Sequence, residues 1–346
     1  KLKQGMINKG YTPEFADRLF NQIKGFGGYG FPESHSASFA LLAYVSAWLK
    51  CHHPAAFYVG LLNSQPMGFY SPSQLVQDAQ RHHILILPTD VNHSDWDHQL
   101  LSSDNTRQPP IRLGLRLVKG LSQAAGKRIS DVRRQRAFIN LADLRRRASL
   151  DRKNMEALAA ADALSSISGH RHQTHWQTMA LEDHQPLLPA EASLKHEARS
   201  EVRLPTPSLG EEVLADYQST GLSLKAHPLA LLRTQYPFSQ CTTQKELIRL
   251  GNHRFVRIAG LITCRQRPGT ASGVVFLTLE DETGNMNVIV WPAVQERYRQ
   301  ALMTSQLVVI KGTVEARNDV VHVIASALEN HSERLSTLTV ASRDFH

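Results

Sequence analysis

The chain has few cysteines and no long apolar run. Its 346 residues include only Cys51, Cys241 and Cys264, which lie far apart and form no C-x-x-C pair. This usage fits a reducing cytoplasm and argues against a disulfide framework or a zinc knuckle. No apolar run approaches the roughly 20 residues that span a bilayer, so no membrane partner is expected. No signal peptide is visible, and because the chain starts at Lys1 rather than Met we expect further residues upstream.

Acidic residues are scarce in one part of the chain. From Arg107 to Lys153, fourteen lysines and arginines face only three aspartates, so this block carries +11 while the whole chain carries +8. The remainder of the chain is therefore slightly acidic. A concentrated basic block on a folded domain indicates a nucleic-acid partner, although a solvated helix face accounts for many such runs.

A glycine-rich stretch precedes a long apolar pattern. Gly25, Gly27 and Gly30 match G-x-G-x-x-G, but that dinucleotide fingerprint requires a preceding strand, and here a helix from Thr12 to Lys24 precedes it. Apolar or small residues then recur at three- and four-residue steps up to Pro54: Phe39, Leu42, Ala43, Ser46 and Leu49. We expect a buried helix and one compact helical unit over residues 1–66. His35, at the start of this helix, is either a core histidine or faces an anion.

This stretch resembles the end of the fingers domain in bacterial C-family DNA polymerases, the polymerase III alpha type. The resemblance continues through AWLKCHHPAAFYVGLLNSQPMGFYSPSQLVQDAQ and LPTDVNHSDWD, and it covers nearly the whole chain. Replicative members usually carry Asn-Lys before Ser-His, whereas this chain has Pro32 and Glu33. This motif resembles that of the error-prone, damage-inducible branch. The resemblance implies translesion synthesis and damage-induced mutagenesis by the whole protein. It also places Tyr29 and His35 near the incoming deoxynucleotide.

Acidic residues suited to polymerase chemistry are not found. A polymerase palm holds two Mg²⁺ ions with clustered carboxylates, and in the family that this chain resembles these aspartates lie upstream of the matched segment. Here the acidic residues of the first 100 positions are scattered: Glu14, Asp17, Glu33, Asp78, Asp90, Asp95 and Asp97. We therefore expect a C-terminal portion of a DNA-directed DNA polymerase that is inactive alone, with no catalytic residue, no metal site and no bound cofactor. A non-catalytic DNA-binding adaptor, a piece of a replicative alpha subunit, a pseudogene-like fragment and a split gene remain alternatives.

The basic block resembles a helix-hairpin-helix motif, in which a glycine hairpin presents backbone N–H groups to a DNA phosphate. Val118–Ser122 forms the predicted hairpin, and a helix over Asp151–Ala163 forms the partner half. The predicted DNA contacts are Lys119, Gly120, Ser122, Lys127 and Arg128. Ser122 replaces the usual second glycine, and an ordinary helical hairpin is the alternative.

The stretch that follows contains several prolines and little apolar periodicity, so it is interpreted as a linker with short helices. The segment from Gln185 to Pro189 stands where replicative relatives carry a sliding-clamp peptide, but Pro189 replaces the expected aromatic residue, so we treat it as degenerate. His170, His172 and His175 have no nearby cysteine and are interpreted as solvated histidines.

The last part of the chain predicts a five-stranded OB-fold barrel. A helix from Pro292 follows the third strand, and Asp281–Gly284 forms a hairpin turn. The predicted strands are Phe255–Cys264, Gly273–Glu280, Asn285–Trp291, Leu307–Val314 and Val320–Ala325. Bases could stack on Phe276 and Trp291, with Arg257, Arg265 and Arg267 supplying charge. Residues 251–331 contain eight basic and seven acidic residues, so a protein-docking or structural barrel is the alternative.

The sequence thus predicts a multidomain α+β protein. The expected units are the end of a fingers domain (1–88), a helix-hairpin-helix region (89–168), a linker with short helices (169–250), an OB-fold barrel (251–331) and a C-terminal tail (332–346). Expected partners are duplex DNA, single-stranded DNA, the incoming deoxynucleotide and accessory mutagenesis proteins. The full-length enzyme is expected to use Mg²⁺.

Overall fold

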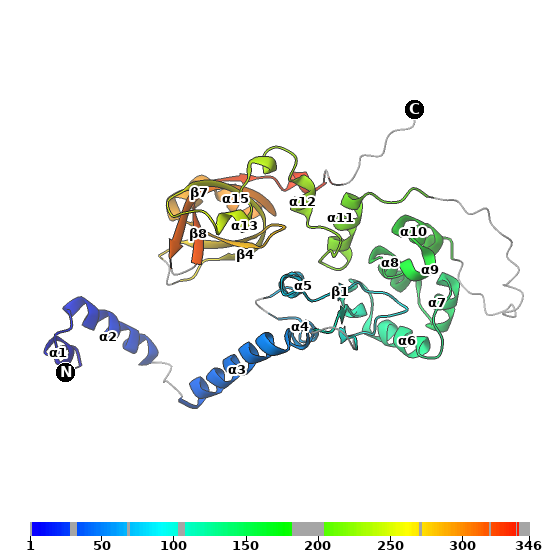
Figure 1. The fold of residues 1–346 in the computed structure, drawn as a ribbon, viewed down its shortest axis with the longest axis horizontal. Coiled ribbons are helices and arrows are strands. Elements are labelled where there is room, and N and C mark those ends of the chain that lie inside the picture. The colour runs from blue at the N-terminus through cyan, green and yellow to red at the C-terminus, as the bar shows by residue number, and fades with distance from the viewer. Residues whose placement is uncertain are drawn as a thin grey trace, which may run out of the picture.

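A computed structural model describes residues 2–27, 33–67, 70–102, 108–181, 204–269, 272–317, 320–336 and 338. Figure 1 shows a barrel and a helical lobe, with one long helix reaching away from both. The chain opens with helices α1 (Leu2–Ile7), α2 (Pro13–Gly27) and α3 (Glu33–His52). Thr12 caps α2 by accepting a hydrogen bond from the Phe15 N–H (3.3 Å). Lys3 and Asp17 join α1 to α2 with an ion pair of 2.6 Å.

Helix α3 has almost no cover in this structure. Apart from Leu49, which is half-buried, the exposed fractions of its large apolar residues run from 43% for Val45 to 70% for Tyr44, and Phe39 and Leu42 are also more than half exposed. The expectation of a buried helix in one compact unit is therefore wrong. Periodicity identifies side chains that avoid water but does not say what covers them. A helix that is apolar on several sides is typical of the interior of a larger protein. Within the described ranges, no helix meets the length and hydropathy needed to cross a bilayer.

The C-terminal end of α3 joins a small α/β unit. Helices α4 (Pro54–Asn63) and α5 (Pro72–Arg81) pack on a three-stranded sheet of β1 (Ile86–Leu87), β3 (Ile111–Arg112) and β2 (Gln99–Leu100). Strand β1 runs parallel and β2 antiparallel to the central β3. Ser71 and Gln74 form the capping box that begins α5.

The basic block folds into a helical lobe with its own apolar core. Its elements are η1 (Leu115–Leu117), α6 (Gln123–Arg133), α7 (Leu141–Arg147), α8 (Arg152–Ala160), α9 (Ser165–Ser168) and α10 (Arg171–Met179). Ser122, Asn140 and Asp151 cap α6, α7 and α8 in turn. The Trp96 ring lies so close to α6 that a Cβ on Gly126 would be 2.4 Å from it. Trp96 therefore packs directly against α6.

Short helices connect this lobe to the barrel. They are α11 (Leu209–Ser219), α12 (Pro228–Leu232), η3 (Phe238–Gln240) and α13 (Gln244–Leu247). Helix α11 packs on α8, whereas α12 and η3 pack on the outside of the barrel. The turn between α11 and α12 is thus the passage from one body to the other. Gln185–Pro189 lies outside the described residues.

The C-terminal body is a closed barrel with strand order β4-β5-β6-β8-β7. Its strands are β4 (Phe255–Gln266), β5 (Val275–Glu280), β6 (Asn285–Val290), β7 (Leu307–Arg317) and β8 (Val320–Asn330). Helices α14 (Pro292–Arg297) and α15 (Arg299–Thr304) follow β6, and α16 (Glu333–Ser336) follows β8. This is the predicted OB-fold order. The Asp281 N–H donates to the Gly284 carbonyl (2.9 Å), which closes the predicted turn.

Candidate nucleic-acid interface

The predicted hairpin, Val118–Ser122, connects η1 to α6. Gly120 has a φ of +87°, the left-handed region that favours glycine. Three neighbouring amides already donate within the fold: Lys119 to the Ser219 carbonyl (2.8 Å), Leu121 to the Val118 carbonyl (3.3 Å) and Ser122 to Asn154 Oδ1 (3.2 Å). In the described part of the chain, the Gly120 N–H has no such acceptor. Gly120 is therefore the hairpin position whose amide is left to meet a ligand.

The three predicted cations differ in their surroundings. Lys119 Nζ donates to the Tyr217 and Gln218 carbonyls (3.1 and 2.9 Å), so it caps the C-terminal end of α11. Arg128 donates to the Ala148 and Ser149 carbonyls (2.9 and 3.2 Å). Lys127 is exposed, one turn into α6, and makes no ion pair or hydrogen bond with any described residue. Among the three, Lys127 is the cation most available to a phosphate.

Much of the basic block serves the fold itself. Asp143, whose side chain is 4% exposed, holds the guanidinium groups of Arg136 and Arg147 (both 3.1 Å) and lies 3.8 Å from that of Arg146. Arg133 pairs with Asp95 and Arg116 with Asp97, and both aspartates lie outside the block. The composition of the block therefore overstates the number of cations that are available to a ligand.

The barrel presents aromatic and apolar side chains on the outer face of β5, β6 and β8. Phe276, Ile289 and Ile324 are partly exposed and form one row across these strands, because Phe276 pairs with Ile289 and Ile289 with Ile324. Trp291, just after β6, is 51% exposed. Both predicted aromatics are thus accessible.

Two of the three predicted barrel arginines, Arg257 and Arg265, have partners within the fold, whereas Arg267 is exposed. Arg257 donates to Glu329 (3.2 Å) and Gln240 (3.1 Å) and stacks on the Tyr236 ring. Arg265 donates to the Leu302 carbonyl (2.9 Å) and the Ser305 carbonyl at the end of α15. Burial lowers the pKa of Arg265. The side chains of Arg257 and Arg265 therefore make hydrogen bonds within the barrel body itself.

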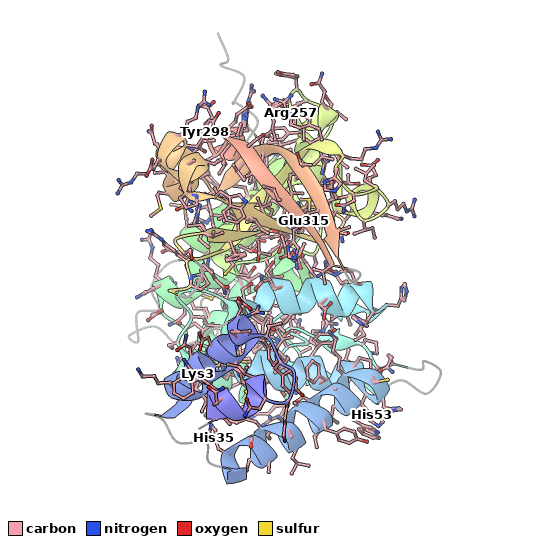
Figure 2. The ribbon with its side chains drawn as sticks, turned by 90° about the vertical axis from the view of Figure 1, so that its left-hand side faces the viewer. Lys3, His35, His53, Arg257, Tyr298 and Glu315 are labelled. Carbon is pink, nitrogen blue, oxygen red and sulfur yellow. The ribbon has the colours of Figure 1, made fainter. Side chains whose placement is uncertain are left out.

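Of the two residues predicted to lie near the nucleotide, the structure describes only His35. His35 is exposed near the start of α3, and its ring meets the Phe39 ring edge-on at 4.5 Å. Figure 2 shows His35 and the barrel residue Arg257 at opposite ends of the molecule. Tyr29 lies outside the described residues.

Two of the three clustered histidines make hydrogen bonds within the fold, and the third, His175, is exposed. His170 Nδ1 accepts from the Gln173 N–H and caps α10, and His172 Nδ1 lies 3.0 Å from the Pro205 carbonyl. Across the described ranges, no three His, Cys, Asp or Glu side chains gather as a metal ion would require.

Sequence reasoning missed a buried histidine beside the hairpin lobe. His98 Nδ1 accepts the Gly114 N–H (3.0 Å), so its ring must be neutral at that nitrogen. Burial, and then the charge of Arg116, lowers the pKa of His98 to about 4. Gly114 is required there, because a Cβ would lie 2.4 Å from the Trp96 carbonyl. A histidine two residues after a tryptophan gave no signal of this role.

Comparison with known families identifies the two modules. Residues 83–174 match the family described as "Helix-hairpin-helix motif", and residues 256–330 match the "OB-fold nucleic acid binding domain". The helix-hairpin-helix and OB-fold predictions are thereby confirmed. Among solved structures, asparaginyl-tRNA synthetase from Pyrococcus horikoshii is 24% identical over the matched region, with a TM-score of 0.23. The match covers 26% of this chain and 22% of the synthetase chain. That likeness is too weak to argue from.

Curated relatives match the whole chain. It is 53% identical to an error-prone DNA polymerase of Saccharophagus degradans over 100% of its own length and 34% of the relative. The corresponding protein of Teredinibacter turnerae is 54% identical over 99% of the chain and 34% of the relative. The chain thus spans about a third of the length of these relatives. The resemblance drawn from the sequence, including the error-prone branch, is confirmed.

Proposed function

This chain corresponds to the C-terminal third of the error-prone DNA polymerases, and we propose that it is the DNA-binding part of such an enzyme. The whole protein is then a DNA-directed DNA polymerase acting in translesion synthesis and damage-induced mutagenesis. The observation that carries the proposal is the match at 53% identity over the whole length of this chain. The two nucleic-acid-binding modules support it.

The chemistry of nucleotide transfer belongs to residues outside this stretch. Polymerases act through a divalent metal that is held by clustered carboxylates, and no such cluster occurs among the residues that the structure describes. The residues present do not fit a Mg²⁺ pair, so we assign no catalytic step to them. Mg²⁺ is proposed for the whole enzyme.

The helix-hairpin-helix lobe is proposed to hold duplex DNA by its backbone. The Gly120 N–H, which has no acceptor among the described residues, can donate to a phosphate beside the N-terminal end of α6, where the helix dipole is positive. Lys127 lies one turn further along α6 and adds a full charge. Such contacts carry no sequence information, which suits an enzyme that moves along any template. Ser122 caps α6 by accepting from the Ala125 N–H (3.2 Å), and its O–H can still donate to a phosphate.

The barrel is proposed to hold the single-stranded template. Phe276 and Trp291 offer faces for base stacking, and stacking is tolerant of sequence. Because Arg257 and Arg265 are engaged within the barrel, we expect stacking to contribute more of the affinity than charge does. Tyr29 and His35 are proposed to lie near the incoming deoxynucleotide. Accessory mutagenesis proteins, a degenerate clamp peptide near Gln185 and a cytoplasmic location complete the proposal.

The test uses the pure 346-residue chain and the whole protein in parallel. The chain should bind a primer–template but give no primer extension with Mg²⁺ and deoxynucleotides, whereas the whole protein should extend past a template lesion. Extension by the pure chain would contradict the assignment of catalysis to residues elsewhere. A chain that fails to bind primer–template would contradict the DNA-gripping role, and a whole protein without extension would favour a non-catalytic adaptor.

A further inference from the structure

The passage between the helical lobe and the barrel is very short. On the lobe side, Lys225 Nζ binds Asp162 (2.9 Å), which follows α8, and Glu212 of α11. On the barrel side, His227 begins α12, whose Leu229 is buried against the barrel. Ala226 is the one residue between these two anchors. The connection therefore permits rotation of one body against the other but very little separation.

The two bodies do not share an apolar core. Among the described residues, the apolar clusters of the lobe and the small sheet have no member in common with the two clusters of the barrel. The bodies do touch at Gly210, where an added Cβ would lie 2.2 Å from the Leu338 carbonyl. This contact lies at the N-terminal end of α11, at the opposite end of the helix from Ala226. An interface without a common apolar core depends on its polar contacts to fix an angle.

A buried carboxylate of the barrel, that of Glu280, lies close to the connection between α11 and α12. Glu280, at the end of β5, is 2% exposed. Its Oε1 accepts from Gln77 Nε2 on α5 (2.6 Å) and lies 3.3 Å from His227 Nε2. His227 Nδ1 accepts the Leu229 N–H (3.2 Å), so the proton is on Nε2 and points to Glu280. One carboxylate therefore joins the small α/β unit, through Gln77, to the barrel side, through His227. That unit is tied to the lobe, since Arg116 of η1 donates to the Asn63 carbonyl of α4 (2.7 Å).

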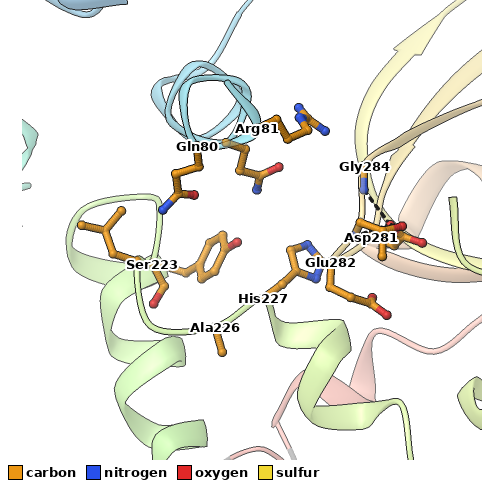
Figure 3. Close-up of a pocket in the computed structure, with 12 residues that line it drawn as sticks. Gln80, Arg81, Ser223, Ala226, His227, Asp281, Glu282 and Gly284 are labelled. Carbon is orange, nitrogen blue, oxygen red and sulfur yellow. Dashed lines mark hydrogen bonds between the residues drawn. The ribbon is translucent and has the colours of Figure 1, made fainter. Parts of the chain in front are cut away.

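A polar cavity of about 320 Å³ lies beside this contact. Figure 3 shows that Gln80 and Arg81 of α5 face His227 and the hairpin of Asp281 and Glu282 across it. Burial, and then the charge of Glu280, raises the pKa of the Tyr217 phenol, which lines the cavity, so that group stays neutral. The partners of Glu280, Gln77 and His227, thus border a polar cavity, so their hydrogen bonds rather than apolar contacts restrain this side of the junction.

We propose that Glu280 is a positioning residue that fixes the angle between the barrel and the helix-hairpin-helix lobe. A buried carboxylate that loses its donors is left desolvated, so the contact has one strongly preferred geometry. If the proposed function holds, the fixed angle presents the Phe276 platform, on the same strand as Glu280, to the single strand that leaves a duplex held by the lobe. The two DNA-binding surfaces then act as one bivalent site.

The direct test measures the distance between the two bodies in the 346-residue chain. Spin labels are placed on cysteines introduced at two exposed positions, Lys153 of the lobe and Glu296 of the barrel, with Cys51 and Cys264 replaced by serine. The parent chain should give one narrow distance distribution. Gln77→Ala should broaden it, and so should Glu280→Ala, with no loss of secondary structure in either variant.

Glu282→Gln is the matched control. It removes a carboxylate from the same hairpin, but Glu282 pairs with Arg233 within the barrel body (2.7 Å), so its distribution should stay narrow. If Glu280→Ala fails to fold, Gln77→Ala decides the result, because it leaves the barrel intact. A distribution that stays as narrow in Gln77→Ala as in the parent would overturn the proposal.

A DNA measurement then separates this proposal from the proposed function on which its consequence rests. Gln77→Ala should bind duplex alone and single strand alone as the parent does. It should lose roughly threefold or more of the extra affinity for a duplex with a long single-stranded overhang. If the parent binds neither DNA alone, the proposed function fails while the distance result stands. An unchanged overhang affinity in Gln77→Ala, beside a broadened distance, would contradict the positioning of the two DNA surfaces.

Discussion

Lys127 provides the sharpest test of the hairpin as a duplex-binding surface. Each cation that neutralises a phosphate contributes about 0.9 to the slope of log K against log salt. Lys127→Ala should flatten that slope by about 0.9, which is about a threefold change in the affinity ratio between 50 and 200 mM salt. Thermal stability should be unchanged, because the side chain is exposed and alanine favours a helix.

Lys119→Ala and Arg128→Ala should behave differently. Lys119 caps the end of α11 through two carbonyls, and losing this cap should cost roughly 1 kcal/mol of unfolding free energy. The slope should change little for either variant. If all three cations met phosphates, replacing Lys119, Lys127 and Arg128 together with alanine would lower the slope by roughly two to three units. The contacts of Lys119 and Arg128 within the fold reduce our expectation for this triple variant to about one.

The assay is fluorescence anisotropy of the 346-residue chain with a blunt duplex, over several salt concentrations and at least two DNA sequences. Lys245→Ala, an exposed lysine on α13, removes the same charge away from the hairpin and controls for net charge. Binding by Lys127→Ala with the parent slope would refute the reasoning and leave the hairpin a structural turn. A loss confined to one DNA sequence would instead indicate base contacts.

Two further predictions concern histidines. Because the pKa of His98 falls from 6.5 to about 4 on folding, the unfolded chain protonates first, so about 3 kcal/mol of stability present above pH 6.5 should be lost as the pH falls to 4. His98→Gln should flatten this dependence in thermal melts, and an unchanged pH profile would show that other groups cause it. In the whole protein, His35→Ala should raise the KM for deoxynucleotide and leave the melting temperature unchanged. Lower thermal stability with normal kinetics would favour a structural histidine.

The barrel was predictable because its signals are local. Strands β5 and β6 alternate buried and more exposed residues. Asp281 organises its own turn by accepting from the N–H groups of Thr283 and Gly284 (2.7 and 2.8 Å). The bulge between Lys311 and Gly312 was not predicted. It depends on a partner strand, since a Cβ on Gly312 would lie 2.3 Å from the Ile324 carbonyl. Local patterns therefore define the strands, and close approaches between strands define their irregularities.

The candidate interface was predictable only in its location. The excess of cations between Arg107 and Lys153 correctly drew attention to the lobe matched by the helix-hairpin-helix family. It could not tell which cations serve the fold, because their acceptors are distant: Asp95 for Arg133, and backbone carbonyls 98 and 99 residues away for Lys119. Carbonyl acceptors carry no side-chain signal at all. Counting charges thus ranks segments of a chain, but three-dimensional contacts are needed to rank individual residues.

Glu280 shows the same limit in a sharper form. In the sequence it begins the run Glu-Asp-Glu-Thr-Gly, which is typical of a solvated turn, yet it is 2% exposed. Its partners are 203 residues upstream at Gln77 and 53 residues upstream at His227. A carboxylate is costly to bury unless donors meet it, so the folded chain must bring α5 and α12 to the same point. Such a residue is invisible to local patterns, because its partners come from elements far apart in the sequence, and it marks where two bodies without a common apolar core are held together.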